Sequence, residues 1–71
     1  MGEKKKLIEE LYAKYEKYKE TAEQHEFPSL MYYDVFLNAG YKDLQENYTK
    51  EHADKFINGI KIVLNRLGIE L

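Results

Sequence analysis

Few side chains in this sequence are of kinds that do chemistry, and the two histidines come first among them. His25 precedes Glu26, and His52 follows Glu51. If the fold brought these two stretches together, two imidazoles and two carboxylates could bind a metal ion. The chain has no HExxH or other spacing that holds metal ligands on one element. We therefore predict no metal site, with His25 at a helix end and His52 on the surface of a first helical turn.

Covalent catalysis has still fewer candidates. The chain contains no cysteine, which excludes thiol catalysis, disulfides and thiolate metal sites. Its only serine, Ser29, is explained as a helix N-cap, and the sequence has no glycine-rich phosphate loop. We predict that the protein is not an enzyme and has no catalytic or cofactor-binding residue.

The charge distribution argues against nucleic acid as the partner. The formal net charge is −2, but residues 1–19 carry six lysines and four glutamates. Residues 20–54 carry eight acids and two lysines, and residues 55–71 carry three cations and one acid. A nucleic-acid binder concentrates positive charge where it meets phosphate. Here the middle of the chain, which is best placed to present a recognition element, is acidic.

The length of 71 residues predicts one domain, residues 1–71, near the size at which stability becomes marginal. Such a chain often completes its core with a second copy or another protein. The basic start MGEKKK is soon followed by Glu9 and Glu10, which interrupt the apolar run of a signal peptide. No segment approaches the roughly 20 apolar residues of a membrane span. We expect a soluble, cytoplasmic protein without membrane contact.

Apolar residues recur at helical spacing near the start of the chain. The positions that share one side of the predicted helix are spaced three or four residues apart: Ile8, Leu11, Tyr15, Tyr18, Ala22 and His25. This pattern predicts an amphipathic helix over residues 3–25. The helix must end before Pro28, because the residue before a proline is disfavoured in the α region.

A second, shorter helix is predicted over residues 29–39. Ser29 is placed to cap its start, and Gly40 to end it in the left-handed conformation. One side of this helix carries Leu30, Tyr33, Phe36 and Leu37, and the other carries Met31, Tyr32 and Val35. A helix that is apolar nearly all round is either buried at the centre of a fold or half-covered by another chain.

The rest of the chain predicts two more helices. Asp43 followed by Glu46 resembles a capping box and indicates a short connecting helix over residues 43–48. Thr49 then provides an N-cap for a last helix over residues 50–67. A break at Thr49 also allows three more side chains to turn into the core: Tyr41, Leu44 and Tyr48.

The stretch FINGIKIVL, residues 56–64, contains an Asn-Gly pair between apolar residues, which is a strong signal for a β-hairpin. The preceding EHADKFI, however, is poor in β-branched residues and does not alternate. Seven apolar residues instead match helical spacing: Ala53, Phe56, Ile57, Ile60, Val63, Leu64 and Leu67. Since Gly68 also provides a stop, we predict a helix, with Gly59 inside it at a cost of about 1 kcal/mol relative to alanine.

One stretch resembles a known DNA-binding unit. LNAGYKDLQENY, read as a helix, an Ala-Gly turn, an apolar residue and a second helix, is similar to the turn of a helix-turn-helix protein. The resemblance implies that the second helix reads DNA. The charged residues of that helix would be Asp43, Glu46, Glu51 and Asp54 with Lys42 and Lys50. This acidic surface suits phosphate poorly, so a helix-turn-helix DNA-binding protein remains an alternative.

The outer side of the last helix is unusual. At about 100° per residue, Ile62 falls opposite the core side, in line with Lys55 and Arg66. Gly59 falls on the flank, where a glycine lets another helix or chain come close. We interpret these residues as a second contact stripe, beside the one on the helix over residues 29–39.

Together these patterns predict an all-α fold, a small bundle of three main helices plus a short connecting helix. The predicted core contains Leu11, Tyr15, Tyr33, Leu37, Phe56, Ile60, Val63 and Leu64.

The absence of catalytic patterns and the surplus of tyrosine, 7 of 71 residues, favour a non-enzymatic protein-interaction module. It would act as a small regulator, inhibitor or adaptor, and its partner would be another protein or a second copy. A structural homo-oligomer is a further alternative. The predicted partner-binding residues are Met31, Tyr32, Val35, Lys55, Gly59, Ile62 and Arg66.

Overall fold

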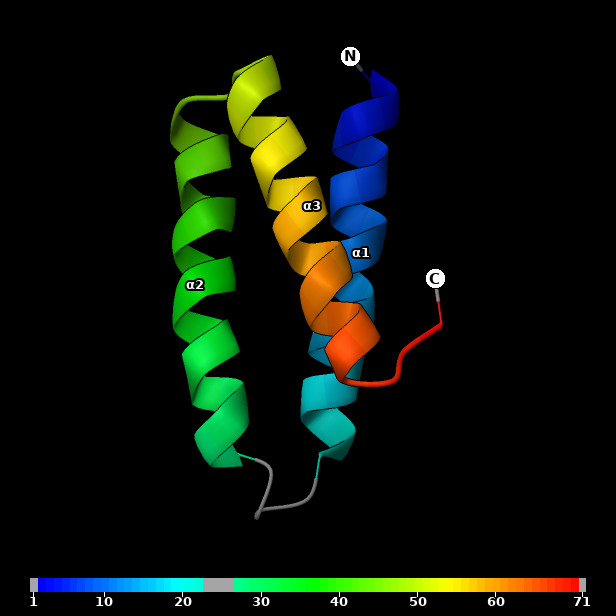
Figure 1. Ribbon diagram of the computed structural model, residues 1–71. Coiled ribbons are helices and arrows are strands. Elements are labelled where there is room, and N and C mark those ends of the chain that lie inside the picture. Colours follow the sequence, from blue (N-terminus) through cyan, green and yellow to red (C-terminus); the bar gives the residue numbers. More distant parts are fainter. Residues whose placement is uncertain (1, 23–26, 71) are drawn as a thin grey trace.

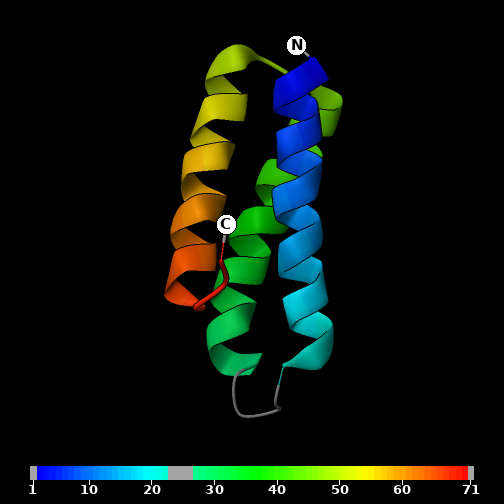
Figure 2. The same ribbon diagram turned by 90° about the vertical axis from the view of Figure 1, so that its right-hand side faces the viewer.

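The computed structural model describes residues 2–22 and 27–70, and this part of the chain contains three helices and no strand. They are α1 (Gly2–Thr21), α2 (Phe27–Glu46) and α3 (Lys50–Arg66). The helices run alternately up and down, and α3 packs against both α1 and α2 (Figures 1 and 2). The bundle measures 37 × 21 × 17 Å. The prediction of an all-α bundle is confirmed.

α2 is longer than predicted and absorbs the short connecting helix. It begins at Phe27 and continues without interruption to Glu46, so the prediction of a separate connecting helix is wrong. Ser29 lies inside the first turn and is not the N-cap. Pro28 also lies in that turn, which tolerates it because the N–H that proline lacks would have no helical partner there.

Gly40 is part of α2, and its predicted role as a left-handed helix end is wrong. Among the described glycines, only Gly68 has a positive φ, of 78°. A Cβ added at Gly40 would lie 3.0 Å from Phe56 Cδ2. The glycine therefore allows α3 to approach α2 closely. Since α2 continues through this described stretch, it also lacks the Ala-Gly turn of a helix-turn-helix unit.

α1 ends earlier than predicted. Its last helical residue is Thr21, and Ala22 follows outside the helix. The Thr21 hydroxyl donates a hydrogen bond to the Tyr18 carbonyl at 3.1 Å, which satisfies one of the carbonyls that a helix end leaves unpaired. The predicted end at residue 25 lies outside the described residues, as do His25 and Glu26.

The boundaries of α3 follow the predicted signals. Thr49 Oγ1 accepts a hydrogen bond from the His52 N–H at 3.1 Å, which is the geometry of an N-cap. At the other end, Gly68 is left-handed and the Ile69 N–H donates to the Leu64 carbonyl at 2.9 Å. The predicted break before α3 is confirmed. The Asn-Gly pair lies inside this helix, so the rejection of a hairpin is also confirmed.

The core lies where the three helices meet. Its buried apolar residues are Ile8, Leu11, Tyr15, Leu30, Leu37, Leu44, Ala53, Phe56, Ile57, Ile60, Val63 and Leu64. Seven of the eight predicted core residues are among them, and the eighth, Tyr33, is half-buried. Tyr41 and Tyr48 pack against this core, as a break at Thr49 predicts.

Alanine substitutions at Gly40 and Gly59, the glycines in the interiors of α2 and α3, are expected to change the free energy of unfolding in opposite directions. Gly40→Ala is expected to lower the free energy of unfolding by about 1 kcal/mol, because crowding of the buried Phe56 ring outweighs the gain in helix propensity. At Gly59 the added Cβ would meet Phe36 Cε1 at 3.0 Å, but that ring is exposed and can turn toward solvent. Gly59→Ala should therefore raise the free energy of unfolding by up to about 1 kcal/mol. Urea denaturation checks both, and equal effects would contradict the assigned contacts.

Candidate protein-binding surface

The outer side of α2 is apolar. The exposed fractions of Met31, Tyr32, Val35 and Phe36 are 68%, 81%, 71% and 58%. These residues recur at spacings of three and four, and exposed Ala39 continues the stripe for another turn. Because the solvent side of a surface helix is normally polar, this stripe departs strongly from an ordinary surface.

The stripe is exposed because α2 presents its other side to the core. Leu30, Leu37 and Leu44 recur at steps of seven residues and are buried. At about 100° per residue, Val35 and Ala39 lie on the opposite side of the helix. Figure 1 shows α2 at the edge of the bundle, with neither α1 nor α3 beyond it. Within the described part of the chain, this side of α2 is therefore left uncovered.

α3 extends the apolar stripe. Phe36 lies over Gly59, and Asp43 Oδ2 lies 3.5 Å from His52 Nδ1. These two contacts are seven residues apart on each helix, which sets the antiparallel register of α2 and α3. Ile62, with an exposed fraction of 57%, is one turn beyond Gly59 and so lies beside the turn of α2 that precedes Phe36. We call these exposed apolar residues the α2 surface: Met31, Tyr32, Val35, Phe36, Ala39 and Ile62.

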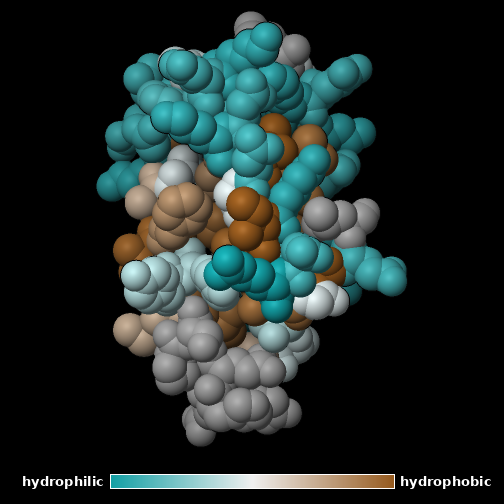
Figure 3. Space-filling model, viewed as in Figure 1, coloured by the Kyte–Doolittle hydropathy of each residue, from teal (hydrophilic) through white to brown (hydrophobic). Residues whose placement is uncertain are grey.

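A groove of about 600 Å³ lies between the exposed sides of α2 and α3. It is lined by Val35, Phe36, Ala39, Gly40, Asp43, His52, Lys55 and Phe56. Figure 3 shows hydrophobic residues over the middle of the molecule and mainly hydrophilic residues at its upper end, where α2 ends and α3 begins. Apolar side chains beside a charged margin are typical of a protein–protein contact.

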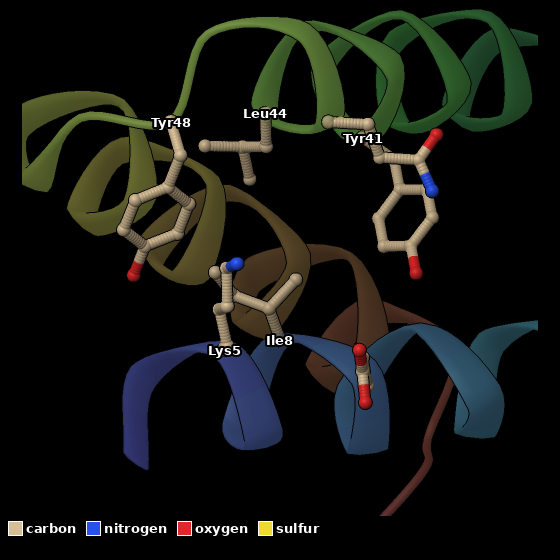
Figure 4. Close-up of a pocket in the computed structure, with 7 residues that line it drawn as sticks. Lys5, Ile8, Tyr41, Leu44 and Tyr48 are labelled. Carbon is tan, nitrogen blue, oxygen red and sulfur yellow. The ribbon is translucent and has the colours of Figure 1, made fainter. Parts of the chain in front are cut away.

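A second hollow, of about 360 Å³, lies between the start of α1 and the end of α2 (Figure 4). It is lined by Lys5, Ile8, Glu9, Tyr41, Leu44, Gln45 and Tyr48. Lys5 Nζ lies 5.4 Å from the centre of the Tyr48 ring, at cation–π distance. The apolar members of this lining belong to the core or pack against it. We assign the hollow no ligand.

A polar cluster on another side of α2 joins it to α1. Asp34 Oδ1 accepts hydrogen bonds from the Tyr15 hydroxyl and from Lys19 Nζ, each at 2.9 Å. Asp34 Oδ2 accepts a third from the Asn38 amide at 3.1 Å. Burial raises the pKa of Asp34, but the hydrogen bonds from Lys19 and Tyr15 outweigh it, so the net pKa is lowered. Because its members satisfy one another, the cluster is structural.

The same cluster changes the titration of Tyr15. Its side chain is fully buried, and this burial, together with the hydrogen bond to Asp34, raises the pKa of the phenol. The pKa of Lys19 is also raised, chiefly by its hydrogen bond to Asp34. Each group is therefore held in the protonation state that makes the contact, which favours a role in holding α1 against α2.

Metal-site geometry, membrane-spanning helices and similarity to known proteins assign no role to the α2 surface. Within residues 2–22 and 27–70, no three histidine, aspartate or glutamate side chains gather as a metal site. None of the described helices is both long and apolar enough to cross a membrane. No family model, curated protein or solved structure matches this chain.

Most of the predicted partner-binding residues are exposed in the structure. Six predicted partner-binding residues are exposed, namely Met31, Tyr32, Val35, Lys55, Ile62 and Arg66. Gly59 is half-buried, because Phe36 of the same chain lies against it. The prediction missed Ala39 and Phe36. It grouped Phe36 with the core, although the position of this residue four residues after Tyr32 was a signal for the exposed side. The role of all these residues in binding stays a prediction.

Proposed function

We propose that this chain is a non-enzymatic protein-binding module, which acts as a small regulator, inhibitor or adaptor by covering part of another protein molecule. The observation that carries the proposal is the exposed apolar α2 surface with the groove beside it. Monomeric proteins rarely leave a contiguous apolar side in water, and such patches commonly mark interaction sites.

The composition of the α2 surface supports this function. Aromatic residues and methionine are enriched at the centre of protein–protein contacts, and this surface has Met31 and Tyr32 on one turn of α2 and Phe36 on the next. Each of them is more than half exposed. Lys55 and Arg66 are exposed on α3 nearby, where charges at a margin can steer and orient a partner.

We further propose that the protein acts in the cytoplasm. The chain has no cysteine, which suits a reducing compartment.

A purely structural homo-oligomer is the second candidate function, because an identical chain could cover the same surface. The α2 surface supports both candidates, and the nature of the bound molecule distinguishes them.

Two substitutions test the proposed surface. Tyr32→Ala and Ile62→Lys are each expected to weaken binding by about 1 to 3 kcal/mol, because the first removes an apolar contact of the surface and the second places a charge in it. Sedimentation of the pure chain and pull-down from a lysate of its source measure the complexes. Lys17→Ala, which changes an exposed residue of α1, is the control and should bind as the unchanged chain does.

Circular dichroism of the same variants shows whether the helices are retained. If both variants keep the helical signal and form complexes as before, the α2 surface is ordinary solvent-exposed surface and the proposal is wrong.

A further inference from the structure

We infer that the α2 surface is covered by a second copy of this chain, with the two α2 helices packed antiparallel about a two-fold axis near Val35. This inference rests on the proposed protein-binding function and identifies the partner. A two-fold contact uses the same surface on both copies, so that surface must be complementary to itself in shape and charge.

The accessible surface is larger than a monomer of this size normally exposes. The chain has 5368 Å² of accessible surface at 8.5 kDa. The scaling for monomeric proteins gives about 4,700 Å² at this mass. The excess is close to the roughly 800 Å² that each partner buries in a standard protein–protein contact. A second copy on the α2 surface would remove an area of that order from water.

The sizes of the side chains favour an antiparallel arrangement. Met31 lies four residues before Val35, and Ala39 lies four residues after it. An antiparallel two-fold exchanges positions at equal distance from the axis, so Met31 of one copy lies against Ala39 of the other. A long side chain then meets a small one at both ends of the contact, as close helix packing requires.

One pair of opposite charges at the two ends of the surface suits the same arrangement. Near the end of α2 and the start of α3 the exposed charges are balanced, with the acids Asp43, Glu46 and Glu51 and the lysines Lys42, Lys50 and Lys55. The other end carries Arg66, in the last turn of α3. The antiparallel two-fold brings Arg66 of each copy toward the end of the other that holds Asp43, which lines the groove together with Lys55.

Sedimentation equilibrium of the full chain, from about 10 µM to about 1 mM, tests the inference, since this range covers weak and moderate affinities. The unchanged chain is expected to form a dimer. Val35→Asp should raise the dissociation constant about tenfold or more, because it places two carboxylates against each other at the axis. Ala13→Asp, which adds the same charge to the exposed side of α1, is the matched control and should leave the dimer unchanged.

Charge reversal tests the orientation. Arg66→Glu and Asp43→Lys should each weaken the dimer, and the double variant should restore much of the loss, because the pair is again of opposite sign. Circular dichroism of each variant confirms that the helices persist. A double variant as weak as the singles, or a dimer that survives Val35→Asp, would overturn the antiparallel contact at Val35.

A chain that stays monomeric at about 1 mM overturns the inference of a second copy. The proposed function fails separately, when pull-down of other proteins also becomes independent of Tyr32 and Ile62. Dimerisation that depends on Val35 and is restored by the charge-swapped pair supports the inference.

Discussion

Phe56→Ala is expected to lower the free energy of unfolding by about 3 to 5 kcal/mol, which is a large part of the stability of a small domain. The ring of Phe56 has an exposed fraction of 5% and lies 6.4 Å from the Tyr12 ring of α1 and 6.1 Å from the Tyr41 ring of α2, between ring centres. The substitution leaves a cavity at the place where the three helices meet. Thermal and urea denaturation followed by circular dichroism measure the loss.

The matched control is Phe36→Ala, which makes the same chemical change on the neighbouring helix. More than half of the Phe36 side chain is exposed, so its removal from the monomer should change the free energy of unfolding by less than about 1 kcal/mol. Both variants are compared at a concentration where association does not contribute. Equal losses in the two variants would mean that the core does not converge on Phe56.

Asp34→Ala has the second large expected effect, a loss of about 2 to 3 kcal/mol. The substitution removes the acceptor shared by Tyr15, Lys19 and Asn38. It also leaves the buried Tyr15 hydroxyl without this partner, and an unsatisfied buried donor costs about 1 to 3 kcal/mol. Urea denaturation at neutral pH measures the effect.

A second substitution separates the two contributions. Tyr15→Phe in the Asp34→Ala background removes the orphaned hydroxyl and keeps the buried ring, so it should recover part of the lost stability. Tyr15→Phe alone should destabilise the protein, because it breaks the hydrogen bond to Asp34. If Tyr15→Phe has the same effect in both backgrounds, the two side chains are not coupled and the cluster does not hold α1 to α2.

The cluster also predicts a pH dependence. The pKa of Asp34 is lower in the folded chain than its ordinary value of 3.8, so its contribution to stability is present above that pH and is lost as the pH falls through the folded pKa. The pKa of Tyr15 is raised above 10.0, so its contribution is present below pH 10.0 and is lost as the pH rises beyond it. The stability difference between the unchanged chain and Asp34→Ala should therefore shrink at low pH.

Local signals in the sequence were sufficient for α3. The helical period of its apolar residues, the Thr49 cap and the Gly68 stop all act within a turn or two of the backbone, and the structure has each of them. Gly40 shows where such reasoning fails. The sequence around Gly40 is typical of a helix end, yet a glycine is needed there because the Phe56 ring of α3 packs against it. Single-sequence patterns do not reveal such tertiary contacts.

The α2 surface divides in the same way. Val35 and Tyr32 were predicted to lie away from the core side because helical spacing fixes their angle. Phe36 lies near the boundary between the two sides, where spacing alone does not decide burial. The structure places Phe36 over Gly59. This packing of α2 against α3 explains why a glycine, which is unfavourable inside a helix, occurs at this position.

The position of α3 in the bundle has a consequence for the order in which the protein forms during synthesis. Half of the twelve described core residues belong to α3, and α1 and α2 both pack against it. A ribosome releases α1 and α2 before α3, so both earlier helices wait with their core sides in water. During that interval α2 is apolar on two sides, so the nascent chain is exposed to chaperones and to aggregation until α3 emerges.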